Sequence, residues 1–242
     1  MKKKYKIKPG ERVVVLTGAG ISAESGIKTF RDSDGLWKNH KIEEVASMDG
    51  FRANPELVWE FYKLRFHQLA EVKPNPAHYA LVKLENHVPD TFTLITQNVD
   101  GLHWVAGNEN VLEMHGSLKR CSCSDCREEF RTREVDLTKK VPECPECRGY
   151  LRPDIIWFGE EPYYLYEIMR EVEICNYLIV VGTSGIVYPA AGLLEKAKEC
   201  GATTIGVNLQ KPENIANIDE FHEGKAGIIL PELVAQLTGV KE

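Results

Sequence analysis

The sequence lacks the features of several classes of protein. No apolar run approaches the roughly 18 residues that a membrane-spanning helix needs, and no internal repeat is present. The chain also lacks an excess of basic residues, because its formal net charge is −6 and its isoelectric point is about 5.7. We therefore expect no membrane span, and no global basic field that would recruit nucleic acid or an anionic membrane.

The composition is that of a globular protein. The chain has 242 residues, of which 43% are hydrophobic and 27% charged, enough for one large domain or a core domain with a smaller insertion. This excludes a disordered chain, a collagen-like repeat and a coiled coil. Lysines crowd residues 2–8, but a strand-like run at 13–16 follows them where a signal peptide would have its apolar region. We interpret the start as a solvated basic tail, with a contact to substrate or nucleic acid as the alternative.

Seven cysteines are an odd number for a disulfide framework. Four of them form two Cys-x-x-Cys pairs separated by 17 residues, a spacing typical of a zinc ribbon. These residues are Cys123, Cys126, Cys144 and Cys147. Cys121 is an alternative partner for Cys126. Because four thiolates complete the coordination of the ion, the zinc would hold structure and do no chemistry. Metal-binding thiols also indicate a reducing compartment, so we expect a cytoplasmic protein.

Short apolar runs alternate with helical patterns along the chain. We expect buried parallel strands at 13–17, 92–96, 177–181, 203–207 and 226–230. We expect helices at 55–70, 76–86, 162–174, 189–200 and 231–237. This alternation predicts an α/β fold with a doubly wound, Rossmann-type parallel sheet.

Small and amide residues follow four of the expected strands. In strand order they are Gly18, Ala19, Gly20, Ile21, Ser22 and Ala23; Gln97, Asn98, Val99 and Asp100; Gly182, Thr183, Ser184 and Gly185; and Asn208, Leu209 and Gln210. Ligands of open parallel sheets bind at the carboxyl ends of the strands. The four strand ends therefore predict one polar crevice.

The first strand end has the pattern G-x-G-x-x-A. Such a turn allows close approach to a pyrophosphate, although a tight turn without a ligand is the alternative. A dehydrogenase would have a second strand ending in an acidic residue about 20 positions later. This chain has a polar loop at 29–37 with Phe30 and Trp37 instead. The pattern therefore favours a loop that closes over a dinucleotide and argues against hydride transfer.

Together these motifs resemble the sirtuins, the NAD-dependent protein deacylases. The matching segments are residues 18–27, 29–31, 35–37, 96–103, 113–116, the two cysteine pairs, 157–160, 182–184 and Asn208. They follow the family's order from about residue 10 to 230. Lys28 departs from the family, which usually has proline there, and this bears on the stiffness of the cofactor loop.

The resemblance implies a two-part architecture. A large Rossmann-type domain would comprise about 9–31, 75–118 and 158–240. A small domain would combine a helical insertion, about 32–74, with the zinc ribbon, about 119–157. NAD, consumed as a co-substrate, and an acylated lysine of a protein or peptide would enter the cleft from opposite sides. The resemblance gives no reason to expect nucleic acid or membrane binding, and we take a monomer as the default.

The resemblance also assigns the chemistry. A lone histidine is more often structural, but His115 matches the family's catalytic base, with Asn98 ordering the ribose. In the family the acyl oxygen attacks the ribose carbon that bears nicotinamide, and the histidine then deprotonates a ribose hydroxyl that attacks the resulting imidate. The products are free lysine, nicotinamide and O-acyl-ADP-ribose. The implied NAD-binding residues are Gly18, Ala19, Gly20, Ile21, Ser22, Ala23, Gly26, Ile27, Thr29, Phe30, Arg31, Trp37, Gln97, Asn98, Asp100, His115, Gly182, Thr183, Ser184, Asn208, Leu209, Gln210 and Ala226.

Two positions on one helix bear on the acyl group. Tyr62 and Arg65 lie three apart and share a face, a spacing at which a phenol and a guanidinium can grip one carboxylate. A partly exposed helix face is the alternative. The pair resembles the signature of class III sirtuins, which remove succinyl and malonyl groups, and Ala46 matches a small residue that widens their acyl pocket. The other implied substrate contacts are Val99, Ile156, Phe158, Gly159 and Val187.

Three other functions use some of the same features. A mono-ADP-ribosyltransferase would pass ADP-ribose from NAD to a protein nucleophile. A zinc-ribbon module that binds NAD as a sensor would release no nicotinamide, and loss of His115 would be silent. A dehydrogenase would reduce its cofactor, but the acidic strand end that it needs is missing.

Overall fold

The computed structural model of the protein describes residues 5–27 and 41–240. Its centre is a six-stranded parallel sheet in the order β3-β2-β1-β7-β8-β9. The strands are β1 (Val13–Thr17), β2 (Phe92–Thr96), β3 (Val111–Glu113), β7 (Tyr177–Val181), β8 (Thr203–Asn208) and β9 (Glu220–Glu223). The doubly wound α/β fold expected from the sequence is confirmed.

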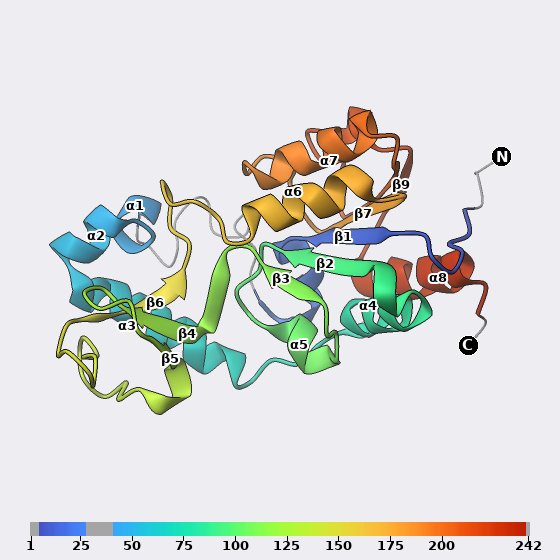
Figure 1. Ribbon diagram of the computed structural model, residues 1–242. Coiled ribbons are helices and arrows are strands. Elements are labelled where there is room, and N and C mark those ends of the chain that lie inside the picture. Colours follow the sequence, from blue (N-terminus) through green and yellow to red (C-terminus); the bar gives the residue numbers. More distant parts are fainter. Residues whose placement is uncertain (1–4, 28–40, 241–242) are drawn as a thin grey trace.

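Helices cover both faces of this sheet (Figure 1). Successive strand residues point to opposite faces, so Val13 and Val15 pack beneath α4 (Pro76–His87) and α8 (Ala226–Thr238). Val14 and Leu16 pack beneath α6 (Leu165–Ile174) and α7 (Ala190–Glu199). Because both faces are buried, the strands read as continuous apolar runs in the sequence.

A second lobe lies beside the carboxyl ends of the strands (Figure 1). Its three-stranded antiparallel sheet has the order β5-β4-β6, with strands β5 (Glu129–Arg131), β4 (Gly116–Cys123) and β6 (Leu151–Ile155). Three helices pack on it: α1 (Ile42–Val45), α2 (Met48–Ala53) and α3 (Pro55–Leu69). A short helix, α5 (Leu102–Ala106), follows β2 on the main sheet. We call the second lobe, which consists of β4, β5, β6, α1, α2 and α3, the small lobe.

Caps and prolines set the helix starts. Asn54 accepts a hydrogen bond from the Leu57 amide, and Pro55 is the first residue of α3. Asn75 caps α4 in the same way, since its side chain accepts from the Ala77 amide. The Asn75 amide group also donates to the Ile21 carbonyl at 2.7 Å and to the Ser25 hydroxyl at 3.0 Å. It therefore ties the start of α4 to the segment that follows β1.

One expected strand is wrong. Residues 226–230 begin helix α8, and two strands of the sheet that were not expected are β3, Val111–Glu113, and β9, Glu220–Glu223. The buried residues of α8 are Ala226, Leu230, Leu233, Val234 and Leu237. This is helical spacing, which the short apolar run concealed. Pro231 lies inside the helix and begins no new one.

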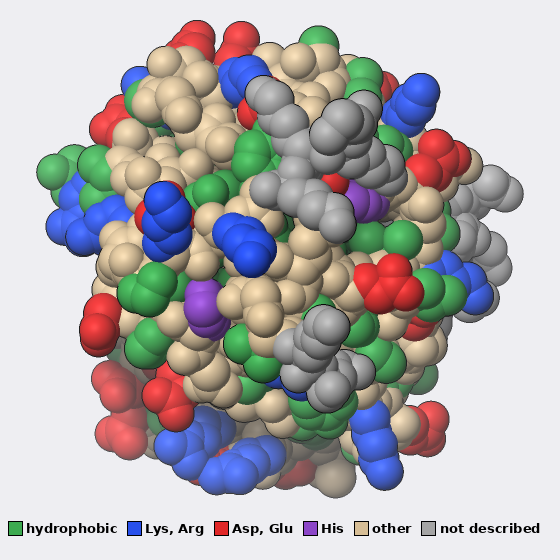
Figure 2. All heavy atoms as spheres, turned by 90° about the vertical axis from the view of Figure 1, so that its right-hand side faces the viewer, with side chains coloured by type: hydrophobic (Ala, Val, Ile, Leu, Met, Phe, Trp, Pro, Cys, Tyr) green, Lys and Arg blue, Asp and Glu red, His purple; other side chains and the backbone are tan. Residues whose placement is uncertain are grey.

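The other differences from the sequence prediction concern where helices begin. Helix α6 begins at Leu165, three residues later than expected, and α7 begins at Ala190, one residue later. Among the described residues, no helix is both long and apolar enough to cross a membrane. On the face of the main lobe opposite the small lobe, acidic and basic side chains are interspersed (Figure 2).

Candidate active site

The segment after β1 lies directly against the segment after β7. The chain leaves β1 into a 3-10 helix, Ala19–Ser25, and the Gly20 amide donates to the Gly182 carbonyl at 2.8 Å. A Cβ atom on Gly20 would lie 2.7 Å from the Gly182 Cα, and one on Gly18 would lie 2.9 Å from the Gly182 oxygen. Glycine is therefore required for the two strand ends to meet.

A buried polar cluster joins the first strand end to the second. The Ser22 hydroxyl donates to the Asp100 carboxylate at 2.7 Å. The Asn98 amide donates to Ser22 Oγ at 3.1 Å and to the Gly18 carbonyl at 3.2 Å. Burial raises the pKa of Asp100, against the opposing effect of hydrogen bonds from Leu102 and Ser22. The cluster therefore fixes the side chains of Ser22, Asn98 and Asp100 relative to one another.

The third and fourth strand ends join the same assembly. The Gln97 side chain donates to Thr183 Oγ1 at 3.2 Å, and the Asn208 side chain donates to the Thr183 carbonyl at 2.7 Å. Residues at the carboxyl ends of four different strands are thus connected by hydrogen bonds. These polar residues lie close together, as the polar crevice predicted from the sequence requires.

One of two further predicted cofactor residues is joined to this network. Leu209 is 54% exposed, and its amide donates to Asn208 Oδ1 at 2.9 Å. Ala226 is buried in the hydrophobic core at the start of α8. The Gly227 amide beside it donates to Glu24 at 2.7 Å, which links α8 to the segment after β1. The predicted residues Thr29, Phe30, Arg31 and Trp37, and also Lys28, lie outside the described residues.

His115 lies in the turn between β3 and β4. Its Nδ1 is 3.1 Å from the Gln97 carbonyl oxygen, and its own carbonyl accepts from the Ile156 amide at 3.0 Å. A carbonyl oxygen only accepts, so Nδ1 carries the proton and Nε2 keeps a free lone pair. Burial lowers the pKa of His115, although the bond to Gln97 opposes this shift. The imidazole is therefore neutral near pH 7 and able to take a proton.

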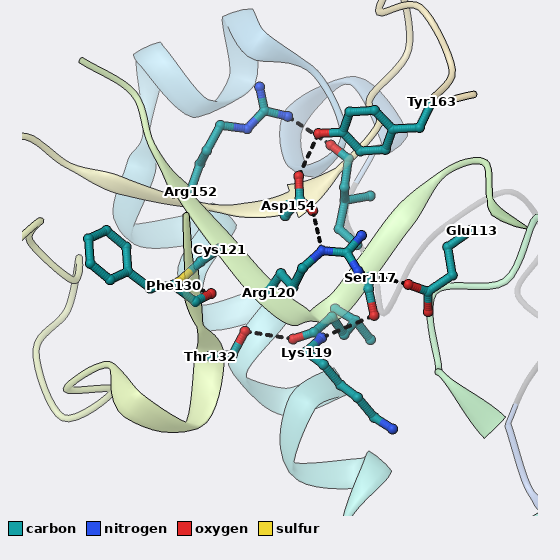
Figure 3. A network of polar contacts seen from close by, with 12 residues as sticks. Glu113, Ser117, Lys119, Arg120, Cys121, Phe130, Thr132, Arg152, Asp154 and Tyr163 are labelled. Carbon is teal, nitrogen blue, oxygen red and sulfur yellow. Dashed lines mark hydrogen bonds and ion pairs between the residues drawn. The ribbon is translucent and has the colours of Figure 1, made fainter. Parts of the chain in front are cut away.

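An ionic network braces the two strands on either side of the turn that carries His115 (Figure 3). Arg120 on β4 donates to Glu113 on β3 at 2.9 Å and to Asp154 on β6 at 2.8 Å. The Tyr163 hydroxyl donates to the other oxygen of Asp154 at 2.5 Å. The Tyr163 amide donates to the carbonyl of Met114, next to His115, at 3.0 Å.

Sequence reasoning missed this network. Its members come from β3, β4, β6 and the segment before α6, and the one available signal is that a short strand, β6, holds two charged residues, Arg152 and Asp154. Asp154 lies in β6, where all five residues are buried. A buried carboxylate needs a partner, but the sequence alone does not say that Arg120 provides it.

Of the predicted acyl-group residues, Ala46 and Tyr62 lie in the core of the small lobe, and Arg65 is partly buried. Tyr62 is 2% exposed, so its side of α3 is not the solvated helix face considered as the alternative. The Trp157 indole donates to the Tyr62 oxygen at 3.0 Å, and the Arg65 guanidinium carbon lies 4.5 Å from the centre of the Phe61 ring. Burial raises the pKa of Tyr62 to about 12 and lowers that of Arg65 to about 10.

The segments expected to contact a peptide are exposed. Phe158 is 62% exposed and Val187 is 44% exposed. The Phe158 amide donates to the carbonyl of Ala46 at 3.1 Å, which places the acyl-pocket residue next to this segment. Gly159 has a φ of +91°, and a Cβ atom added to it would meet no other atom within 4 Å. An extended backbone can approach such a segment without a steric clash.

The four paired cysteines converge at one point of the small lobe. Their sulfur atoms all lie within 4.8 Å of one another. The Cys123–Cys147 and Cys126–Cys144 sulfur distances are 3.4 and 3.7 Å. Tetrahedral zinc with bonds of about 2.3 Å requires sulfurs about 3.8 Å apart, so the site fits this ion. Cys121 lies outside the cluster, near the Phe130 carbonyl at 3.7 Å, which supports the choice of Cys123.

Comparison with known proteins identifies the family. A model of the Sir2 family matches residues 18–189. An NAD-dependent protein deacylase of Bdellovibrio bacteriovorus is 49% identical over 93% of this chain and 96% of its own. The crystal structure of a Sir2 homologue bound to NAD superposes with a TM-score of 0.86 at 41% identity, covering 93% of this chain and 89% of the other.

The chain belongs to the Sir2 family.

A further Sir2 structure, bound to a myristoylated histone peptide, is similar to this sirtuin with a TM-score of 0.75 and 38% identity, over 93% of this chain and 90% of the other. The predicted family and the predicted fold are thereby confirmed. The sirtuin fold also accounts for the zinc ribbon and the strand-end crevice occurring in one chain.

Proposed function

We propose that this sirtuin is an NAD-dependent protein lysine deacylase. It consumes NAD as a co-substrate and transfers the acyl group of a lysine to ADP-ribose. The observation that carries the proposal is the position of His115, whose Nδ1 is held by the Gln97 carbonyl at 3.1 Å within the connected strand ends. Family membership and the deacylase names of the relatives support the same reaction.

Each group in the crevice has a role in this proposal. Asn98 and Asp100 order the nicotinamide ribose and its pocket, and both are held by Ser22. The acyl oxygen displaces nicotinamide from the ribose carbon. His115 Nε2 then accepts the proton of a ribose hydroxyl, which attacks the imidate carbon. Addition of water releases the free lysine and O-acyl-ADP-ribose.

The zinc ribbon supports this site without taking part in the chemistry. Four thiolates would complete the coordination of the ion and leave no position for a substrate or water. The ribbon sheet is continuous with the catalytic turn, because β4 begins at Gly116, next to His115. We assign the boundaries of the large and small domains as the resemblance implies, with the peptide entering between them.

We further propose that the enzyme prefers acidic acyl groups such as succinyl. The Tyr62 phenol and the Arg65 guanidinium would bind the acyl carboxylate, and Ala46 would leave room for the longer chain. Binding an acetyl group would leave those donors without a partner, which costs about 1–3 kcal/mol. Acetyl-lysine is therefore a poorer substrate, but still a substrate.

Mass spectrometry of one peptide sequence with acetyl-lysine or succinyl-lysine, with and without NAD, tests both parts. Loss of succinyl with NAD, abolished in Arg65→Met while acetyl removal survives, is the expected result. Deacetylation alone, unaffected by the substitution, would contradict the acyl preference. Nicotinamide release with neither acyl group removed would favour the alternative, a mono-ADP-ribosyltransferase.

The remaining proposals concern the oligomeric state and the cellular compartment of the enzyme. We propose a monomer in the reducing cytoplasm, a compartment supported by the use of four cysteines as a metal-binding cluster. Light scattering of the zinc-loaded protein at micromolar concentration tests the oligomeric state. A dimer mass would contradict the proposal.

A further inference from the structure

The indole of Trp157 controls which way the Tyr62 hydroxyl can donate. Trp157 Nε1 lies 3.0 Å from the Tyr62 oxygen. An indole N–H is a donor only, so the phenol oxygen must be the acceptor. A phenol has one proton, and that proton must then point away from Trp157. It is available to a second acceptor.

We infer that Trp157 is a positioning residue for acyl-group selectivity, which directs the Tyr62 proton toward the carboxylate of an acidic acyl group. The inference rests on the proposed function, in which Tyr62 and Arg65 bind that carboxylate. Tyr62 would donate its proton to one carboxylate oxygen, and Arg65 would supply the positive charge three residues further along α3. An acetyl group has no carboxylate, so it gains nothing from a directed proton.

Contacts on several sides hold Trp157 in place. Its backbone amide donates to Glu160 at 2.8 Å, and the Arg152 guanidinium carbon lies 3.7 Å from the centre of the indole ring. The Phe51 ring is 5.5 Å away, and the residue is 2% exposed. The indole N–H therefore has a fixed direction before any substrate arrives, which is the condition for selectivity by preorganisation.

Two of the residues that hold Trp157 in place, Arg152 and Glu160, form an ion pair with each other. Arg152 donates to both oxygens of Glu160, at 2.6 and 2.9 Å, and to the Ile155 carbonyl at 2.8 Å. Glu160 directly follows Phe158 and Gly159, the segment expected to bind the peptide backbone. A chain of contacts therefore runs from the peptide segment through the indole to the phenol. Because the Tyr62 phenol is buried, it keeps its proton over the whole physiological pH range.

The experiment compares kcat/KM for succinyl and acetyl forms of one peptide. Trp157→Phe keeps an aromatic ring for Arg152 but removes the donor. We expect the succinyl-to-acetyl ratio to fall about tenfold, mainly through a higher KM for the succinyl peptide. In the Tyr62→Phe background the same substitution should have little further effect, because the two residues act through one hydrogen bond.

Trp59→Phe is the matched control. Trp59 lies on α3, is 1% exposed, and donates its indole N–H to the Leu151 carbonyl at 2.7 Å. The substitution removes a comparable hydrogen bond from the small lobe, and this bond does not involve Tyr62. The acyl ratio should stay at the wild-type value. An equal fall in Trp59→Phe, or independent effects of the Trp157 and Tyr62 substitutions, would overturn the inference.

A spectroscopic measurement covers the case in which Trp157→Phe does not fold. The four tryptophans give four indole N–H resonances in ¹⁵N-labelled protein. Succinyl peptide should shift the Trp157 resonance more than acetyl peptide does, and equal shifts would overturn the inference.

Arg65→Met separates the proposed acyl preference from the role of Trp157. If Arg65→Met lowers the acyl ratio and Trp157→Phe does not, only the role of Trp157 fails. If neither lowers the ratio, the proposed acyl preference fails as well.

Discussion

The Nδ1 atom of His115 lies 3.1 Å from the carbonyl oxygen of Gln97. The bond joins the turn after β3 to the residue that follows β2, and it selects the tautomer with a free Nε2. Since Gln97 also donates to Thr183, the orientation of the catalytic base is set by the same strand ends that form the crevice.

Replacing His115 with alanine should abolish most of the deacylation. Loss of a positioned base costs roughly 10²–10⁴-fold in rate, measured as kcat/KM on an acyl peptide. Because burial lowers the pKa of His115 below its ordinary value of 6.5, the acid limb of the wild-type profile should have its midpoint below pH 6.5. NAD binding measured by calorimetry should survive the substitution. A variant that deacylates at the wild-type rate would show that His115 is not the base.

Loss of one zinc ligand should destabilise the small lobe. Cys144 is fully buried among its hydrophobic residues, so Cys144→Ser removes both a ligand and a core contact. Bound zinc, measured by elemental analysis, should fall, and the melting temperature should drop by several degrees because metal binding is coupled to folding. Cys200→Ser changes an exposed thiol outside the cluster and serves as the control. One zinc per chain in Cys144→Ser would contradict the four-thiolate assignment.

Removal of the Arg120 guanidinium should lower the free energy of unfolding. Arg120→Met leaves the nearly buried carboxylates of Glu113 and Asp154 without their cation, and breaking such a pair costs about 3 kcal/mol. Urea unfolding measures the change. Arg52→Met is the control, since the Arg52–Asp49 pair is exposed and should contribute less than about 1 kcal/mol. Equal effects of the two substitutions would refute a special role for the network.

Stability should decrease in mild acid because two histidines are buried. Burial lowers the pKa of His78 to about 4 and that of His103 to about 3. Below pH 6.5 the unfolded chain binds protons at these rings while the folded chain does not, so the free energy of unfolding falls as the pH falls. Each ring contributes about 1.4 kcal/mol per pH unit in this range.

Urea unfolding at pH 7.5 and pH 5.5 measures this dependence. His78→Gln should make it shallower, whereas His67→Gln, at an exposed position on α3, should leave it unchanged. An unfolding free energy that is the same at both pH values in the wild type would mean that the buried rings take up protons without unfolding.

Local patterns predicted much of the fold. Strands β1, β2, β7 and β8 were visible as apolar runs because both of their faces are buried, and the zinc cluster was visible because its ligands lie in two close pairs. The prediction of a strand at 226–230 was wrong because a short apolar segment fits a buried strand and a buried helix equally well. Only the longer spacing that includes Leu233 and Leu237 distinguishes the two.

The contacts that orient the site could not be predicted from local patterns. Trp157 meets Tyr62 across 95 positions of the chain, and Arg120 meets Asp154 across 34. Both pairs lie within the small lobe, and they depend on how its helices and strands pack against one another. The residue types were visible in the sequence, but their partners were not.

The hydrogen bonds of Asn75 have a consequence for how the chain is assembled. They fasten the first turn of α4 to Ile21 and Ser25, so Ser25 and Asn75 lie side by side although 50 positions separate them in the sequence. The point at which the chain returns to the main sheet is therefore fixed next to the point at which it left the first strand. A change within α1, α2 or α3 that keeps these hydrogen bonds should leave the start of α4 in place.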